Sequence, residues 1–101
     1  MNLIHLKDAE KVPIDIAAHK IFGNEKTEAI HLLFQPGEVL FKHANPFDVL
    51  FYVLQGSGSL EVGDETFTVG PDTLIEVPAG DQRGWTNTGS EELRVLVIKL
   101  L

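Results

Sequence analysis

At 101 residues, the chain is long enough to close one hydrophobic core and too short for two, so we expect a single domain over residues 1–101. The formal net charge of −7 argues against nucleic acid and against an anionic membrane as partners, because both are bound through clustered lysine and arginine. The absence of cysteine excludes disulfides, thiolate metal ligands and cysteine nucleophiles. No stretch near the N-terminus is apolar enough for a signal peptide or a membrane span, and we expect a cytoplasmic location.

Helical features are confined to the N-terminal region. Lys7–Lys11 and Ile14–Lys20 could each support a turn or two, but Pro13 interrupts the region because proline cannot donate the backbone hydrogen bond of a helix interior. The prediction is a short irregular or helical N-terminal segment followed by strands only.

The rest of the chain consists of short runs rich in Val, Ile, Leu, Phe and Thr, separated by clusters of Gly, Pro, Asn and Asp. This spacing is typical of an antiparallel sandwich or barrel, so the predicted fold class is all-β. The expected strands are Ala18–Phe22, Glu28–Phe34, Val39–His43, Val49–Gln55, Gly58–Val62, Glu65–Val69, Thr73–Val77, Gly84–Thr88 and Leu93–Leu100.

The clearest hairpin joins Ser59–Val62 to Glu65–Val69 through Gly63–Asp64. A two-residue loop that begins with glycine suits a type II′ turn. Because side chains alternate between the faces of a strand, the apolar positions of this hairpin should all point inward. These positions are Leu60, Val62, Phe67 and Val69.

Two of the expected strands are apolar on both faces, which a half-exposed strand would not be. They are Val49–Leu54 and Leu93–Ile98. Either a second layer of the same chain or an identical subunit must cover their outer side. So small a domain has few residues left for a second layer, so we expect that an identical subunit covers this side in a homodimer.

Two stretches, residues 37–56 and 72–87, carry spaced motifs. The spacing of Gly37, His43 and Gly56 resembles the first conserved motif of the cupin superfamily, G-x5-H-x-H-x3/4-E-x6-G, and Pro78–Asn87 resembles the second, G-x5-P-x-G-x2-H-x3-N. The resemblance covers residues 28–100 in the expected order. It implies a double-stranded β-helix, which is a jelly-roll barrel whose open end holds a ligand or a metal between the two motifs.

In the family, three histidines and a carboxylate of these motifs grip a metal ion. Of the four positions only His43 keeps its ligand, since the others are Asn45, Val49 and Arg83. One imidazole and a weak amide oxygen are too few ligands for a divalent ion. At about 4 Å and an effective dielectric near 20, a guanidinium would repel that ion by on the order of 8 kcal/mol.

Asp48, next to Val49, is the nearest substitute for the missing carboxylate. A shift of one residue along a strand turns the side chain to the opposite face, so Asp48 should point away from the barrel if Val49 points in. We therefore predict no metal ion and no other cofactor.

Without a metal, the same end of the barrel presents a set of residues that could bind an organic anion. Arg83 would donate to a carboxylate or phosphate, aromatic rings would form flat walls, and His43 would help to fix orientation. The simpler alternatives are that Arg83 pairs with Glu76 or Asp81 and that Trp85 only fills the core. The predicted ligand-binding residues are His43, Asn45, Val49, Phe51, Arg83 and Trp85.

Two hypotheses of function follow. The first is a metal-free module that binds a small anionic or sugar-like molecule in the barrel mouth. The second is an enzyme, either an isomerase or epimerase with His43 as general base or a metal-dependent oxygenase with a reduced ligand set. We favour binding, because the sequence shows no partner that would orient His43 as a base.

Overall fold

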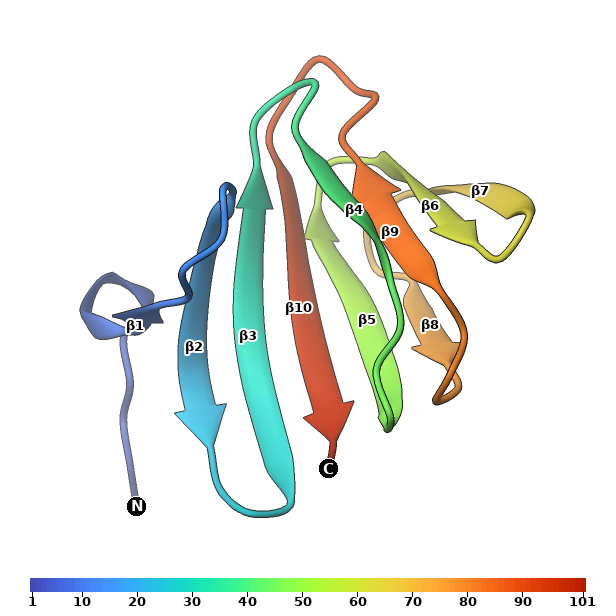
Figure 1. Ribbon diagram of the computed structural model, residues 1–101. Helices are drawn as coiled ribbons and strands as arrows, with labels where there is room; N and C mark the ends of the chain where they lie inside the picture. Colours follow the sequence, from blue (N-terminus) through green and yellow to red (C-terminus); the bar gives the residue numbers. More distant parts are fainter.

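The computed structural model describes residues 1–101, and strands dominate it (Figure 1). One 3₁₀ turn, η1 (Leu6–Asp8), precedes the strands, and the chain contains no apolar helix of membrane-spanning length. The strands are β1 (Glu10–Lys11), β2 (Ala17–Gly23), β3 (Thr27–Phe34), β4 (Val39–His43), β5 (Asp48–Gln55), β6 (Gly58–Val62), β7 (Glu65–Val69), β8 (Leu74–Val77), β9 (Arg83–Thr86) and β10 (Leu93–Leu100). A helical turn over Ile14–Lys20 is wrong, because β2 takes up most of that range.

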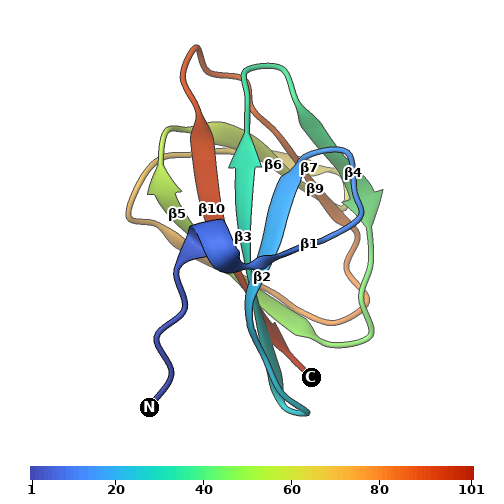
Figure 2. The same cartoon turned by 90° about the vertical axis from the view of Figure 1, so that its left-hand side faces the viewer.

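The strands form two antiparallel sheets that face each other (Figure 2). The first has six strands in the order β1-β2-β3-β10-β5-β8, and the second has four in the order β4-β9-β6-β7. This is the predicted all-β jelly roll with the connectivity of a double-stranded β-helix. Because β7 and β8 each end a sheet and do not pair with each other, the barrel is open between them, as it is between β4 and the β1–β2 edge.

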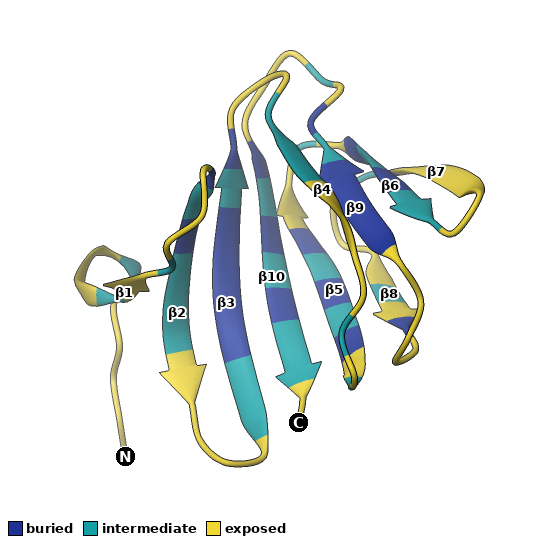
Figure 3. Cartoon of the chain, viewed as in Figure 1, coloured by how far each residue is buried: buried dark blue, intermediate teal, exposed yellow.

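Alternation along the strands places the core between the sheets (Figure 3). In β5, for example, Val49, Phe51 and Val53 are buried, whereas the residues between them are only partly covered. Phe34, Leu60, Trp85 and Leu93 complete the centre of the core, each with at most 1% of its surface exposed. The alternation of apolar residues in the sequence therefore corresponds to side chains that point alternately into the core and away from it.

The β6–β7 hairpin turns through Gly63 at φ +59° with Val62 opposite Glu65, as predicted for a two-residue loop led by glycine. Of its four predicted inward residues, Leu60 and Val69 are buried and Val62 is half-buried. Phe67 also lies on the inner face, opposite Leu60, yet 46% of its surface remains exposed. The reason is that β7 is an edge strand, so no strand of the opposite sheet lies over its inner face.

The outer face of the six-stranded sheet keeps apolar side chains at its centre. Leu50 lies opposite Ile98 and Tyr52 opposite Leu96, and all four are only partly covered. The second sheet packs on the inner face, against Val49, Phe51 and Val53. It therefore does not cover the apolar side chains of the outer face.

Candidate ligand-binding site

A cavity of about 320 Å³ lies between the inner face of the six-stranded sheet and strands β4 and β9 of the other sheet. We call it the basic cavity, because its only ionisable side chains are His43, Arg83 and Lys99 and no carboxylate lines it. The remaining walls are apolar. They consist of Val12, Ile14, Ala18, Ile30, Leu32, Leu40, Phe51 and Val97.

Three of the six predicted binding residues line this cavity, namely His43, Phe51 and Arg83. The β4–β9 ladder places His43 opposite Arg83, so the two motifs meet here as the resemblance implied. Phe51 enters from β5 in the facing sheet.

The other three predicted residues do not line the cavity. Val49 and Trp85 are each 1% exposed and belong to the core, where the Trp85 and Phe51 rings meet edge to face with centroids 5.5 Å apart. Asn45 lies outside the cavity lining, and its backbone carbonyl accepts a hydrogen bond from Gly80 at 2.9 Å. Trp85 therefore fills the core, as the simpler alternative stated.

Arg83 is the most unusual group of the site, because its side chain is charged and only 4% exposed. Its Nη1 donates to the carbonyl oxygen of His43 at 2.6 Å, and its Cζ lies 5.9 Å from the centre of the Phe51 ring. Pairing with Glu76 or Asp81 is wrong, since the three ion pairs of the chain are Lys20–Glu28, Lys42–Glu61 and Lys99–Glu28. Arg83 thus has no anionic partner.

Burial lowers the pKa of Arg83 from its ordinary value, because the cation has lost water without gaining a counter-ion. A guanidinium has five N–H donors, and this one uses a single donor within the protein. None of its nitrogens is among the fully buried polar atoms that lack a partner. The remaining nitrogens therefore keep some accessible surface, and since Arg83 lines the cavity, an anion bound there could pair with the charge and satisfy the free donors.

His43 is exposed at the mouth of the cavity, and its ring is held by its own strand. Nδ1 lies 3.1 Å from the carbonyl oxygen of Phe41. Because a carbonyl oxygen only accepts, this contact places the proton on Nδ1 and leaves Nε2 as an acceptor. His43 can therefore accept a hydrogen bond from a hydroxyl or amide group of a ligand.

The sequence reasoning missed Lys99 and the N-terminal wall formed by Val12 and Ile14. Lys99 has the same parity in β10 as the buried Val95 and Val97, so alternation alone would have pointed it inward. Its Nζ lies 3.8 Å from a carboxylate oxygen of Glu28, which also contacts Lys20, so its charge is partly neutralised. Val12 and Ile14 lie outside both motifs, and no sequence signal marks them.

The residues at the four ligand positions of the family do not fit a divalent metal. His43 supplies the single imidazole, Val49 has no donor atom, and Arg83 brings a cation to the centre of the site. Asp48 does not replace the lost carboxylate, because its Oδ1 accepts a hydrogen bond from the backbone of Ala79 at 2.8 Å on the opposite face of β5. Nowhere in the chain do three or more His, Cys, Asp or Glu side chains gather in a metal-binding group.

Comparison with known proteins assigns the family. The sequence profile of the cupin domain matches residues 22–99, which include both motifs and every strand from β3 to β9. The chain belongs to the cupin family. The fold agrees: a cupin with a double-stranded β-helix from Methanocaldococcus jannaschii superposes with a TM-score of 0.85 at 20% identity, covering 99% of this chain and 90% of the other.

Two curated relatives are similar to this cupin in sequence. A 5-nitrosalicylic acid 1,2-dioxygenase from a Bradyrhizobium species is 30% identical over 66 residues, covering 65% of this chain and 32% of the relative. Auxin-binding protein 1 from Arabidopsis thaliana is 29% identical over 92 residues, covering 82% of this chain and 46% of the relative. The chain spans less than half the length of either, and one is named as an enzyme and the other as a binding protein.

Proposed function

We propose that this cupin domain binds a small organic anion in the basic cavity without a metal ion. The observation that carries the proposal is the buried guanidinium of Arg83, which faces an apolar cavity and has no counter-ion in the chain. A charged group in this position is costly unless it is paired, and a bound carboxylate would pair with it.

The character of the walls narrows the chemical class of the ligand. Eight of the eleven lining residues are hydrophobic, so a sugar would leave most of its hydroxyl groups without partners. A carboxylate with an aromatic or aliphatic body fits better: its charge would meet Arg83, its body would pack on Phe51, and a hydroxyl or amide group could reach Nε2 of His43. The cavity volume is at the lower end of the range of ligand sites, which favours a small molecule.

Isothermal titration calorimetry with a panel of aromatic and aliphatic carboxylates, each paired with its neutral amide, tests the proposal. We expect carboxylates to bind and amides not to bind. Arg83→Lys should weaken the best carboxylate about tenfold to a hundredfold, because a charge-assisted hydrogen bond contributes roughly 1.5–3 kcal/mol.

The matched control is Arg94→Lys, since Arg94 is the only other arginine and lies on the outer face, where its Nε donates to His31. Binding should be unchanged in this variant. Equal affinity for carboxylates and amides, or an equal loss in both variants, would remove Arg83 as the anion anchor.

An enzyme that uses His43 as general base is the second candidate. The Phe41 carbonyl provides the orienting partner that could not be identified from the sequence, although a carbonyl raises basicity less than a carboxylate would. A ligand that binds, and is then converted by the wild type but not by His43→Gln, would establish this function. Stoichiometric iron, manganese, nickel or zinc in protein purified without chelators would instead favour a metal-dependent reaction.

We also propose that two copies associate through the outer face of the six-stranded sheet. Its centre carries Leu50, Tyr52, Leu96 and Ile98, which face one another across the β5–β10 ladder. Sedimentation velocity at micromolar concentration should give a dimer, and Leu96→Lys should give a monomer. A monomeric wild type would contradict the proposal.

A further inference from the structure

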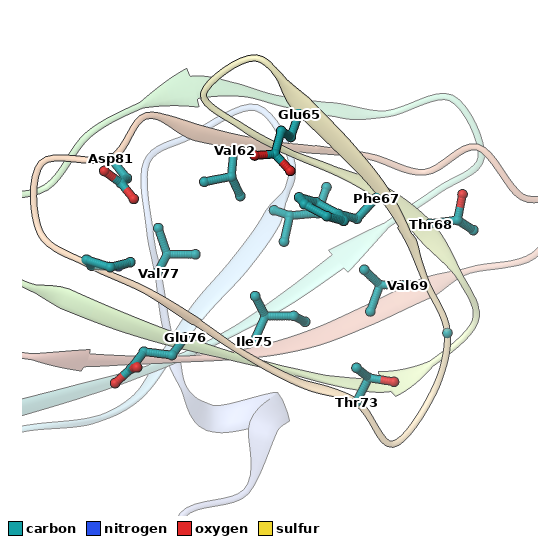
Figure 4. Close-up of a pocket in the computed structure, with 13 residues that line it drawn as sticks. Val62, Glu65, Phe67, Thr68, Val69, Thr73, Ile75, Glu76, Val77 and Asp81 are labelled. Carbon is teal, nitrogen blue, oxygen red and sulfur yellow. The ribbon is translucent and has the colours of Figure 1, made fainter.

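A second, larger cavity lies on the other side of the barrel. It has a volume of about 530 Å³ and is enclosed by the β6–β7 hairpin, strand β8 and the connection from β8 to β9 (Figure 4). Its floor consists of Leu60, Val62, Val69, Ile75 and Val77, with Phe67 as an aromatic wall. We call it the acidic cavity, because its only charged residues are Glu65, Glu76 and Asp81.

The two cavities are separated by the core. Phe51 lines the basic cavity, and its partner in the β5–β8 ladder, Ile75, lines the acidic one. In the other sheet, the buried Trp85 lies opposite Leu60, which forms part of the acidic floor. A ligand in one cavity therefore does not reach the other, and the acidic cavity is not part of the site proposed above.

Carboxylates of two separate elements face the acidic cavity. Glu65 starts β7 and Asp81 lies in the connection after β8, and Figure 4 shows both carboxylates directed toward the apolar floor. Glu76 also lines the cavity, but its carboxylate points away from it. Neither Glu65 nor Asp81 takes part in any of the three ion pairs, and no lysine or arginine lines this cavity.

Phe67 supplies a second, independent indication of a ligand. It has the same parity as the buried Val69 in β7, yet 46% of its surface is exposed, because the open edge between β7 and β8 leaves the space beside it unfilled. An apolar residue on the inner side of a sheet is normally covered, and a ligand would cover it. The face of an aromatic ring also attracts a cation.

We propose that the acidic cavity binds an organic cation with an apolar body, such as an aryl-alkyl or alkyl ammonium ion. The ammonium group would lie between Glu65 and Asp81, and the body would pack on Phe67 and the aliphatic floor. The volume lies well within the range of small-molecule sites.

Other occupants fit less well. A neutral apolar molecule would take water from two carboxylates and give nothing in return. A second copy of a chain with net charge −7 would bring like charges together. A calcium or magnesium ion prefers six or more oxygen ligands, and this cavity is largely apolar.

Calorimetry with phenethylammonium on the full chain tests the proposal, with 2-phenylethanol as the neutral probe of equal shape. We expect the ammonium ion to bind at least tenfold more tightly than the alcohol. The double variant Glu65→Gln/Asp81→Asn should lose at least tenfold in affinity, and Phe67→Ala should also weaken binding. Glu76→Gln is the matched control and should stay within twofold of the wild type.

Circular dichroism should show that these variants remain folded, because all the replaced carboxylates are on the surface. In NMR titrations, phenethylammonium should shift the amide signals of Phe67 and Ile75 and leave those of His43 and Arg83 unchanged. Equal binding of the alcohol, an equal loss in Glu76→Gln, or shifts confined to the basic cavity would overturn the proposal. None of these results depends on whether the basic cavity binds an anion.

Discussion

The basic and the acidic cavity lie between the same two sheets, on opposite sides of one core, and carry opposite charges. In the basic cavity the charge is buried: Arg83 is 4% exposed and its pKa is lowered by desolvation. In the acidic cavity the carboxylates are exposed at the rim, and it is an apolar residue, Phe67, that lacks cover.

This difference follows from how each side of the barrel is closed. On the basic side, residues of the N-terminal segment, Val12 and Ile14, add a wall, so a charged group within it is shielded from water. On the acidic side β7 and β8 are edge strands that do not pair with each other, and both the carboxylates and nearly half of Phe67 remain exposed to water. The same fold thus contains one cavity with a costly buried charge and one with an uncovered apolar surface.

The largest effect that tests this comparison is on stability, through two phenylalanines. Phe51→Ala should lower the free energy of unfolding by about 3–5 kcal/mol, because the ring is 1% exposed and packs against Trp85. Phe67→Ala should lower it by less than about 1 kcal/mol, since the ring is already half in water. Urea denaturation measures both. Equal costs would mean that the hairpin closes over Phe67 in solution.

A smaller effect separates binding from stability at Arg83. Arg83→Met removes an unpaired buried charge and one hydrogen bond, so the free energy of unfolding should stay constant or rise by up to about 2 kcal/mol. Binding of carboxylates should be lost in the same variant. Arg94→Met is the control and should be destabilised by about 1 kcal/mol, because it leaves His31 without its donor. A clear loss of stability in Arg83→Met would assign Arg83 a structural role.

The smallest effect is a pH dependence of the stability, which arises outside both cavities. It determines the pH at which the two cavities should be compared. Burial lowers the pKa of His31 below its ordinary value of 6.5, and the neighbouring Arg94 and His19 lower it further. The unfolded chain therefore takes up this proton at a higher pH than the folded chain does. Stability should be constant above about pH 7 and decline gently as the pH falls below 6.5. His31→Gln should flatten that decline, and an unchanged slope in thermal unfolding would contradict the assignment.

Much of the strand pattern could be predicted from the sequence. The bounds of β4, β6, β7 and β10 agree with the prediction, because alternation and turn glycines are local properties. Among the candidate site residues, His43, Phe51 and Arg83 line one cavity, and their role in binding stays a prediction. Val49 and Trp85 lie in the core instead, because a family motif gives the order of positions along the chain and does not tell which side chains are buried.

The sequence by itself determined the all-β pattern, the type II′ hairpin and which residues stand at the family's four ligand positions, since each can be read from single positions or short stretches of the chain. Only the tertiary structure decided that Arg83 has no counter-ion and that Phe67 is left uncovered. These properties depend on which sheet edges face each other and what lies between them, and no local pattern of residues contains that information.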